Sequence, residues 1–223
     1  MSVAKVMIVE DHPLFSKGLS SLIASQGSYS VVGEAKDSAE AFKLAGEEKP
    51  DLAIVDLNLG DEDGLDLLKD LHSRFPEIAV LVLSMHDERY YAERVLNAGG
   101  RGYIMKAEAG NKVMEAIETV LGGKIYLSKA EQERLSAYLE PGRGQGGPFA
   151  SVEKLSDRQL QVFKLLGKGL GTVEIAAKLN LSAKTIDTHK EHIKIKFHCN
   201  TTQELRQLAI EWVNRPAICG YEP

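Results

Sequence analysis

The chain of 223 residues has few cysteines and no long apolar run. Its two cysteines, Cys199 and Cys219, have no paired spacing, which argues against a disulfide framework and is typical of a reducing compartment. The longest apolar stretch, "IAVLVL", is too short to cross a bilayer. The first residues lack the basic and apolar regions of a secretion signal. We therefore expect a cytoplasmic protein with no membrane partner.

Positive charge is scarce in the first part of the chain. Residues 1–125 contain 13 Lys and Arg against 21 Asp and Glu, whereas residues 152–223 contain 11 against 8. The hydrophobic fraction of 43% is sufficient for buried cores. An acidic part followed by a mildly basic part indicates two roles, and the basic part is a candidate for nucleic-acid contact.

Short β-branched runs alternate with amphipathic stretches over residues 1–125. The runs are "KVMIVE", "SVVGEA", "DLAIVDL", "AVLVLSM" and "GYIMK", and the helical stretches lie near residues 13–25, 38–49, 64–74, 87–98 and 109–121. This alternation predicts an α/β doubly wound domain over residues 1–125, with a five-stranded parallel sheet covered on both faces.

Residues 126–151 are expected to link this domain to the next. Four glycines and two prolines in "LEPGRGQGGPFAS", residues 139–151, indicate a flexible joint. Just before it, "SKAEQERLSAYL" is a possible short helix, packed on either domain or free. The chain thus divides into two domains and a linker.

Helical periodicity continues through residues 152–223. Two capping-box patterns, Ser156 with Gln159 and Thr201 with Glu204, mark helix starts, and Ser182 marks a third. The predicted helices cover residues 156–167, 172–179, 182–197 and 201–213. A short turn between small helices in an all-α module predicts a helix-turn-helix domain.

Charged and polar side chains follow the predicted strands of the first domain. They are Glu10 and Asp11, Asp56, Ser84 and Lys106. Ligand sites of parallel sheets form beyond the carboxyl ends of the strands, so these side chains are expected to converge. Clustered carboxylates repel one another without a cation, and Mg²⁺ prefers such oxygen ligands. Asp56 ends an apolar strand and suits a nucleophile that attacks phosphorus.

Two other interpretations of the carboxylates are weaker. Asp11 precedes Pro13 and is able to cap a helix, but charges gathered at strand ends are uncommon without a partner. An aspartyl-phosphate hydrolase of the haloacid-dehalogenase type carries D-x-D-x-T, whereas "LNLG" follows Asp56 here. The carboxylate that would act as acid and base is missing, so we do not expect a turnover enzyme.

The motifs "VEDHP", "VDLNL", "LSMHD" and "GYIMK" resemble the landmarks of response-regulator receiver domains, and the resemblance covers residues 4–122. It implies a flavodoxin-like fold in which Asp56 accepts a phosphoryl group. It also implies that Mg²⁺ is bound by Glu10, Asp11, Asp56 and the backbone carbonyl of Asn58. Ser84 and Lys106 would contact the phosphoryl group, and Tyr103 would be the aromatic side chain that changes rotamer.

This sequence departs from the receiver pattern at two positions. Glu10 replaces a more frequent Asp, which lengthens one arm of the metal site, and Ala107 stands where many receivers have Pro. Tyr103 also has a simpler interpretation as a half-buried strand aromatic.

The segment "LSDRQLQVFKLLGKGLGTVEIAAKLNLSAKTIDTHKEHIKIKF" resembles the LuxR-type helix-turn-helix of NarL/FixJ response regulators, over residues 152–213. Gln159 and Gln161 are departures from a stretch that commonly has more charge. Helical spacing of residues 183–197 predicts a buried face of Ile186, His189, Ile193 and Phe197. The side chains predicted to contact DNA are Lys184, Asp187, Thr188 and Glu191 on the outer face, with Lys190 and Lys194 on the flank.

Two alternatives remain for this helix. Its charged face is also compatible with a protein-docking module. A zinc site formed by His189, His192, His198 and Cys199 is disfavoured because these side chains do not converge on one tetrahedron.

Together the two resemblances imply a transcription regulator. A histidine kinase would phosphorylate Asp56 with Mg²⁺ bound, and the regulator would then bind double-stranded promoter DNA, as a homodimer. The alternative is an atypical regulator that needs no phosphorylation and uses its receiver as a dimerisation or protein-binding module.

Overall fold

The structure is a computed structural model that describes residues 3–60, 62–138 and 150–214. The described residues form two compact units, 3–138 and 150–214. The predicted glycine-rich joint falls almost wholly on residues 139–149, which lie outside the described residues. None of the described helices has both the length and the apolar character needed to span a membrane. The predicted domain limits of 1–125, 126–151 and 152–223 stay predictions.

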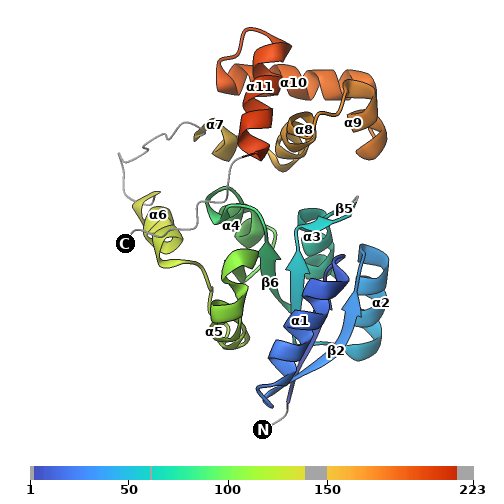
Figure 1. Cartoon of the computed structure of the whole chain (residues 1–223), viewed down its shortest axis with the longest axis vertical. Helices are drawn as coiled ribbons and strands as arrows, with labels where there is room; N and C mark the ends of the chain where they lie inside the picture. Colours follow the sequence, from blue (N-terminus) through green and yellow to red (C-terminus); the bar gives the residue numbers. More distant parts are fainter. Residues whose placement is uncertain (1–2, 61, 139–149, 215–223) are drawn as a thin grey trace. The chain divides into compact units, whose positions relative to one another are not determined.

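The first unit is built on a five-stranded parallel sheet (Figure 1). Its strands are β1 (Ala4–Val9), β2 (Tyr29–Ala35), β3 (Leu52–Asp56), β6 (Ala79–Ser84) and β7 (Gly102–Met105), in the spatial order β2-β1-β3-β6-β7. The central strands are continuous Val, Ile, Leu and Ala runs because both of their faces are buried. The predicted doubly wound fold is confirmed.

Helices cover both faces of this sheet (Figure 1). They are α1 (Pro13–Ala24), α2 (Ser38–Glu48), α3 (Gly64–Arg74), α4 (Glu88–Asn97) and α5 (Ala109–Leu121). The helices α1 and α5 bury one apolar core against the strands, in which Ile23, Val113 and Ile117 contact the sheet residues. The side chains of Asp37, Asp63 and Asp87 accept hydrogen bonds from backbone N–H groups and fix the starts of α2, α3 and α4.

A small antiparallel ribbon, which the sequence did not predict, follows β3. It consists of β4 (Asn58–Leu59) and β5 (Glu62–Asp63), and Gly60 has a φ of 57° in its turn. Two-residue strands have no periodicity to recognise. The N–H of Gly64 donates to the carbonyl of Leu57 over 3.1 Å and closes the segment that contains the ribbon.

Residues 126–138 belong to the first unit. Tyr126 extends the sheet beside β7, since its N–H donates to the carbonyl of Arg101 and its carbonyl accepts from the N–H of Tyr103. The helix α6 (Lys129–Tyr138) then lies against α4. Its Arg134 bonds to the carbonyl of Arg89, and the N–H of Ser128 donates to Glu88 over 2.9 Å. The structure therefore places this predicted helix on the first unit.

The second unit is entirely helical in its described residues. Its helices are α7 (Ala150–Glu153), α8 (Asp157–Gly167), α9 (Thr172–Lys178), α10 (Ala183–Phe197) and α11 (Thr202–Val213). Phe163 at the centre of the core stacks on Phe197 with ring centroids 4.8 Å apart and lies 5.7 Å from Trp212. A Cβ at Gly167 would lie 2.3 Å from the carbonyl oxygen of Ala209, so glycine permits α8 and α11 to approach closely.

The helix starts of this unit were largely predictable. The capping box of Ser156 and Gln159 is confirmed, as is the cap by Ser182. The predicted capping box of Thr201 and Glu204 is right for the Thr201 side chain and wrong for the Glu204 side chain. Thr201 does accept from the N–H of Glu204, but the Glu204 carboxylate accepts from the N–H of Asn200, one residue further back than predicted.

Candidate functional site

Strand register brings the predicted site residues of the first unit to one edge of the sheet. Asp56, the last residue of β3, pairs with Leu83, and Ser84 ends the same neighbouring strand. Ser84 pairs in turn with Met105, so Lys106 follows directly at the end of β7. Glu10 follows β1, which is the other neighbour of β3. Four chain segments therefore supply one site.

Lys106 joins the two buried carboxylates at this edge. Its ammonium lies 2.8 Å from Oδ2 of Asp56 and 2.6 Å from Oε2 of Glu10. Burial raises the pKa of Asp56, and the hydrogen bond and charge of Lys106 offset part of that rise. Burial alone would lower the pKa of Lys106, but its bonds to the two carboxylates outweigh burial and raise that pKa.

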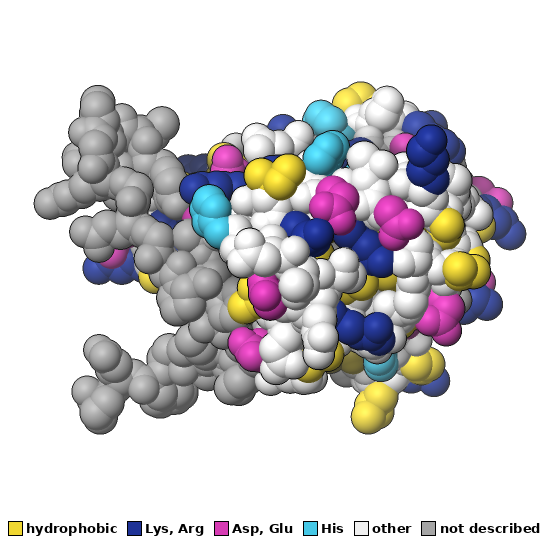
Figure 2. Space-filling model, turned by 90° about the horizontal axis from the view of Figure 1, so that it is seen from above, with side chains coloured by type: hydrophobic (Ala, Val, Ile, Leu, Met, Phe, Trp, Pro, Cys, Tyr) yellow, Lys and Arg dark blue, Asp and Glu magenta, His cyan; other side chains and the backbone are white. Residues whose placement is uncertain are grey.

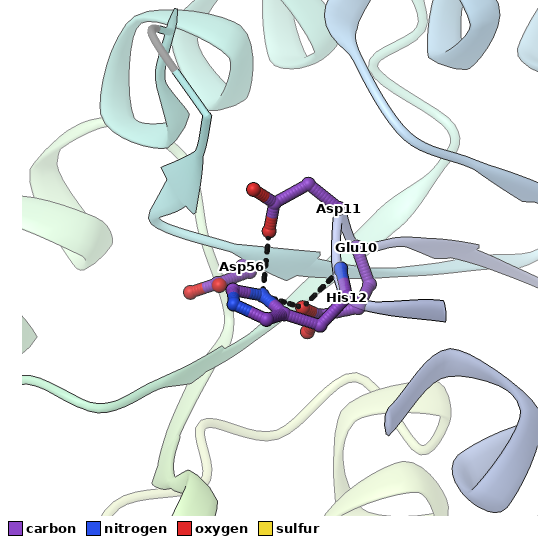
Figure 3. A group of neighbouring side chains, drawn as sticks. All are labelled: Glu10, Asp11, His12 and Asp56. Carbon is purple, nitrogen blue, oxygen red and sulfur yellow. Dashed lines mark hydrogen bonds and ion pairs between the residues drawn. The ribbon is translucent and has the colours of Figure 1, made fainter. Parts of the chain in front are cut away.

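His12 lies against the same carboxylates, a contact that was not predicted from the sequence. Its Nδ1 is 3.0 Å from Oε1 of Glu10 and 2.8 Å from Oδ1 of Asp11. Dashed lines in Figure 3 mark these contacts. The hydrogen bond to Glu10 and the charge of Asp11 raise the pKa of His12. The available signal was its place in "EDHP", directly after two acids. A proton on His12 neutralises part of the cluster's negative charge.

The arrangement fits a divalent cation with a preference for oxygen ligands. Among the described residues, Glu10, Asp11, His12 and Asp56 form a group whose potential ligand atoms all lie within 4.8 Å of one another (Figure 3). Oδ1 of Asp56 is buried and has no hydrogen-bond partner among the described residues, so this oxygen has an unused lone pair in the cluster. Three carboxylates are the donors expected for Mg²⁺ rather than for a softer metal.

Hydrogen bonds connect the loops around the cluster to one another. Oδ2 of Asp11 accepts from the N–H of Gly60 over 2.8 Å, which links the segment after β1 to the β4–β5 turn. Asn58, whose carbonyl was predicted as a metal ligand, lies in β4 two residues after Asp56. Its side-chain oxygen is 3.2 Å from Nε2 of His86, so the segment after β6 supports it.

His86 connects Ser84 to Tyr103. The fully buried hydroxyl of Ser84 accepts from the N–H of His86 over 3.2 Å, and the hydroxyl of Tyr103 donates to the carbonyl of His86 over 2.8 Å. Tyr103 is only 1% exposed, so it is more deeply buried than its simpler interpretation as a half-buried strand aromatic supposed, and its role as switch aromatic stays a prediction. Burial raises the pKa of Tyr103 well above its ordinary value, which keeps the hydroxyl protonated. His86 was missed because its role depends on tertiary contacts.

The helix α10 presents most of the predicted outer face. Ile186 and Ile193 are buried, whereas Lys184, Asp187, Thr188 and Glu191 are exposed. Lys194 lies on the flank and contacts both oxygens of Glu191 at 3.0 Å. Lys190 differs from the predicted flank position because it is buried. Figure 2 shows basic and acidic side chains interleaved on the visible face of the molecule.

The histidines of the second unit do not form a metal-binding group among the described residues. His189 is half-buried, as expected for a packing residue, and its burial lowers its pKa. The groups of three or more potential metal ligands found in the described part of the chain do not include His189, His192, His198 and Cys199.

Comparison with known proteins identifies the class to which this fold and site belong. Residues 6–118 match the response regulator receiver domain, and residues 153–209 match the luxR family of bacterial regulatory proteins. The transcriptional activator protein ExaE of Pseudomonas putida is 35% identical over 206 residues, which cover 92% of this chain and 95% of that protein. The oxygen regulatory protein NreC of Staphylococcus aureus is 33% identical, with 93% and 97% covered.

A solved structure of the RcsB response regulator from Salmonella typhimurium is similar over nearly the whole length. It has a TM-score of 0.71 and 26% identity, and the match covers 95% of this chain and 99% of that one. The chain thus belongs to the response regulators that join a receiver domain to a LuxR-family DNA-binding domain. This family consists of transcription regulators and not of turnover enzymes.

Proposed function

We propose that this regulator is controlled by Mg²⁺-dependent phosphorylation of Asp56 by a histidine kinase, and that it binds promoter DNA through α10. The observation that carries the proposal is the setting of Asp56. This buried carboxylate has a lysine ammonium on Oδ2 and leaves Oδ1 without a hydrogen-bond partner among the described residues. An oriented, desolvated carboxylate oxygen beside a cation is what attack on phosphorus requires.

Each residue of the cluster then has a role. A carboxylate oxygen of Asp56 attacks phosphorus, and the bond to the donor's nitrogen or oxygen breaks. Glu10, Asp11, Asp56 and the carbonyl of Asn58 would hold Mg²⁺, which would supply positive charge to neutralise the phosphoryl oxygens. Lys106, whose ammonium already contacts Oδ2 of Asp56, then bonds to an oxygen of the phosphoryl group. Proton loss from His12 frees the carboxylates of Glu10 and Asp11.

The contacts of His86 link Ser84 in the site to Tyr103 and α4 outside it, so phosphorylation is able to change the conformation of these elements. The hydroxyl of Ser84 donates a hydrogen bond to the phosphoryl group. Its oxygen then turns away from the N–H of His86. His86 also holds the hydroxyl of Tyr103 and precedes α4, so a shift of this segment changes both. Tyr103 is the switch aromatic in this proposal, because its ring is buried and its only polar atom depends on that loop.

The second unit supplies the DNA contacts. The outer face of α10 contacts base edges and Lys194 contacts phosphate. The residues of the outer face are Lys184, Asp187, Thr188 and Glu191. The match to the luxR family and the net basic balance of residues 152–223 support this assignment. Two copies of the chain bind two half-sites as a homodimer, in the cytoplasm, where both promoter DNA and kinase are present.

Binding of DNA tests this function. DNA fragments are first selected from random sequence by the protein treated with acetyl phosphate and Mg²⁺, and affinities are then measured for wild type and Asp56→Ala. We expect treatment to tighten binding by wild type and to leave Asp56→Ala unchanged. Equal affinities of the two treated proteins would favour the alternative, a regulator whose receiver acts only as a dimerisation or protein-binding module.

A further inference from the structure

Lys190 is a basic residue of the DNA-facing helix that does not face solvent. Only 8% of the residue is exposed, in contrast to Lys184 and to the acids on the same helix. A charge removed from water is unfavourable unless it is paired within the protein. Lys190 therefore needs another explanation for its charge.

The ammonium of Lys190 is bound within the protein, across two helices. It donates to the hydroxyl of Thr172, the first residue of α9, and lies 3.4 Å from Oδ1 of Asp187 on α10. The hydroxyl of Thr172 lies 3.4 Å from the same oxygen of Asp187. We call these three residues the α9–α10 clasp.

The clasp differs from another ion pair of α10 in the second helix that it joins. Lys194 and Glu191 form a pair within α10 alone. Their side chains are 16% and 62% exposed, against 11% and 62% for Lys190 and Asp187, so the two pairs are similarly buried. In the clasp the ammonium is largely removed from water, so its separation from Asp187 and Thr172 would leave a buried charge unpaired. Lys190 is therefore held in the free protein and is not available to a phosphate without loss of these bonds.

We propose that Lys190 is a positioning residue for DNA recognition and that Asp187 is the specificity-determining residue that it positions. Both contacts of the clasp use Oδ1 of Asp187, while the residue itself stays exposed, so Oδ2 is the oxygen presented to DNA. A carboxylate oxygen there accepts a hydrogen bond from the exocyclic amino group of cytosine. The ammonium behind it neutralises the carboxylate, which otherwise repels the phosphate backbone. This inference does not require phosphorylation.

The salt dependence of DNA binding separates a positioning lysine from a phosphate-binding one. Lys190→Met keeps the aliphatic stem and removes the charge, and its affinity for a labelled DNA fragment selected by wild type is measured over a range of salt concentrations. We expect about fivefold weaker binding with an unchanged slope of log K against log salt. Loss of a phosphate contact would lower that slope by about 0.9 instead, and this result would overturn the proposal.

Base preference and rescue provide the second readout. Lys190→Met and Asp187→Asn are each expected to relax the preference at the same base pair of the selected site, because both remove the oriented carboxylate. Asp187→Asn in the Lys190→Met background is expected to recover affinity to within about twofold of wild type, since it removes the uncompensated charge. No recovery of affinity in the double variant, or a base preference unaltered by Lys190→Met, would contradict the proposed role of the clasp.

A third variant tests the clasp without a change of charge. Thr172→Val removes the hydroxyl that joins α9 to Asp187 and is expected to relax the same base preference. Lys194→Met is the matched control, because its pair lies within α10 and does not reach α9, and it is expected to retain the preference. Circular dichroism of each variant establishes that α8 to α11 are folded. An unaltered preference in a folded Thr172→Val would also count against the proposal.

Discussion

The ammonium of Lys106 lies between Oδ2 of Asp56 and Oε2 of Glu10, at 2.8 Å and 2.6 Å, and the three side chains are almost completely buried. Neither carboxylate is close to water, so the ammonium of Lys106 compensates much of their negative charge, and His12 also contacts Glu10. In the proposed function the same lysine contacts the phosphoryl group on Asp56. Stability and the proposed chemistry of the receiver are therefore coupled through one side chain.

Replacement of Lys106 by alanine is expected to destabilise the first unit by about 3–5 kcal/mol, because it leaves buried carboxylates without their cation. Urea unfolding followed by circular dichroism measures the change. Trp212, the single tryptophan, lies in the second unit, so its fluorescence should report an unchanged midpoint. Lys129→Ala is the matched control, since its side chain is 91% exposed, and a shift equal to that of Lys106→Ala would contradict this account.

Gly64 is required by the close approach of α3 to the strand that carries Asp56. A Cβ on Gly64 would lie 2.3 Å from the carbonyl oxygen of Asp56 and 2.5 Å from Cα of Leu57. Gly64→Ala is expected to cost about 1–3 kcal/mol, because backbone must move to accept the methyl group. Gly18→Ala, within α1 and with nothing inside 4 Å, is expected to stabilise by about 0.5–1 kcal/mol. Thermal unfolding of both variants provides the comparison. Equal shifts of the unfolding temperature would refute the requirement for glycine at position 64.

Glu88 gives the first unit a dependence on pH. Burial raises the pKa of this carboxyl, which accepts from the N–H of Ser128. A raised folded pKa means that its contribution to stability is complete below the unfolded pKa and is lost as pH rises through the folded pKa. Glu88→Gln keeps an acceptor oxygen and removes the charge. We expect it to be more stable than wild type at neutral pH, with the advantage disappearing in acid; a difference that is constant with pH would contradict this.

Arg134 holds α6 against α4. It bonds to the buried carboxylate of Glu131 at 2.6 and 2.8 Å and to the carbonyl of Arg89 at 3.2 Å. Arg134→Ala leaves Glu131 without its partner, so hydrogen exchange of residues 126–136 is expected to accelerate about tenfold or more. The double variant with Glu131→Gln removes the unpaired charge and should recover part of the protection. Protection equal to wild type in Arg134→Ala would show that α6 is held by other contacts.

The fold and the centre of the site were predictable because they depend on local patterns. Buried parallel strands are apolar throughout, so "DLAIVDL" and "AVLVLSM" are recognisable without any tertiary information. The carboxyl ends of such strands meet at one edge, which is why Asp56, Ser84 and Lys106 converge as predicted. Side-chain caps such as Ser156 are equally local, because donor and acceptor are three residues apart.

The features that escaped prediction depend on contacts between distant residues. Helical spacing placed Lys190 on a flank, but it could not show that Thr172, 18 residues away, lies close enough to bind its ammonium. The docking of α6 depends on Glu88 and Arg89, more than 35 residues earlier in the chain. His86 contacts Asn58, 28 residues earlier, and this partner is fixed only once the sheet edge has formed. His12 is the exception, because its partners Glu10 and Asp11 are its immediate neighbours in the sequence.

The mass of the intact protein after incubation with acetyl phosphate and Mg²⁺ tests the central claim most directly. We predict that wild type gains one phosphoryl group, that Asp56→Ala gains none, and that chelation of Mg²⁺ by EDTA abolishes the gain in wild type. A phosphoryl group on Asp56→Ala, or none on wild type in the presence of Mg²⁺, would contradict the assignment of Asp56 as the acceptor.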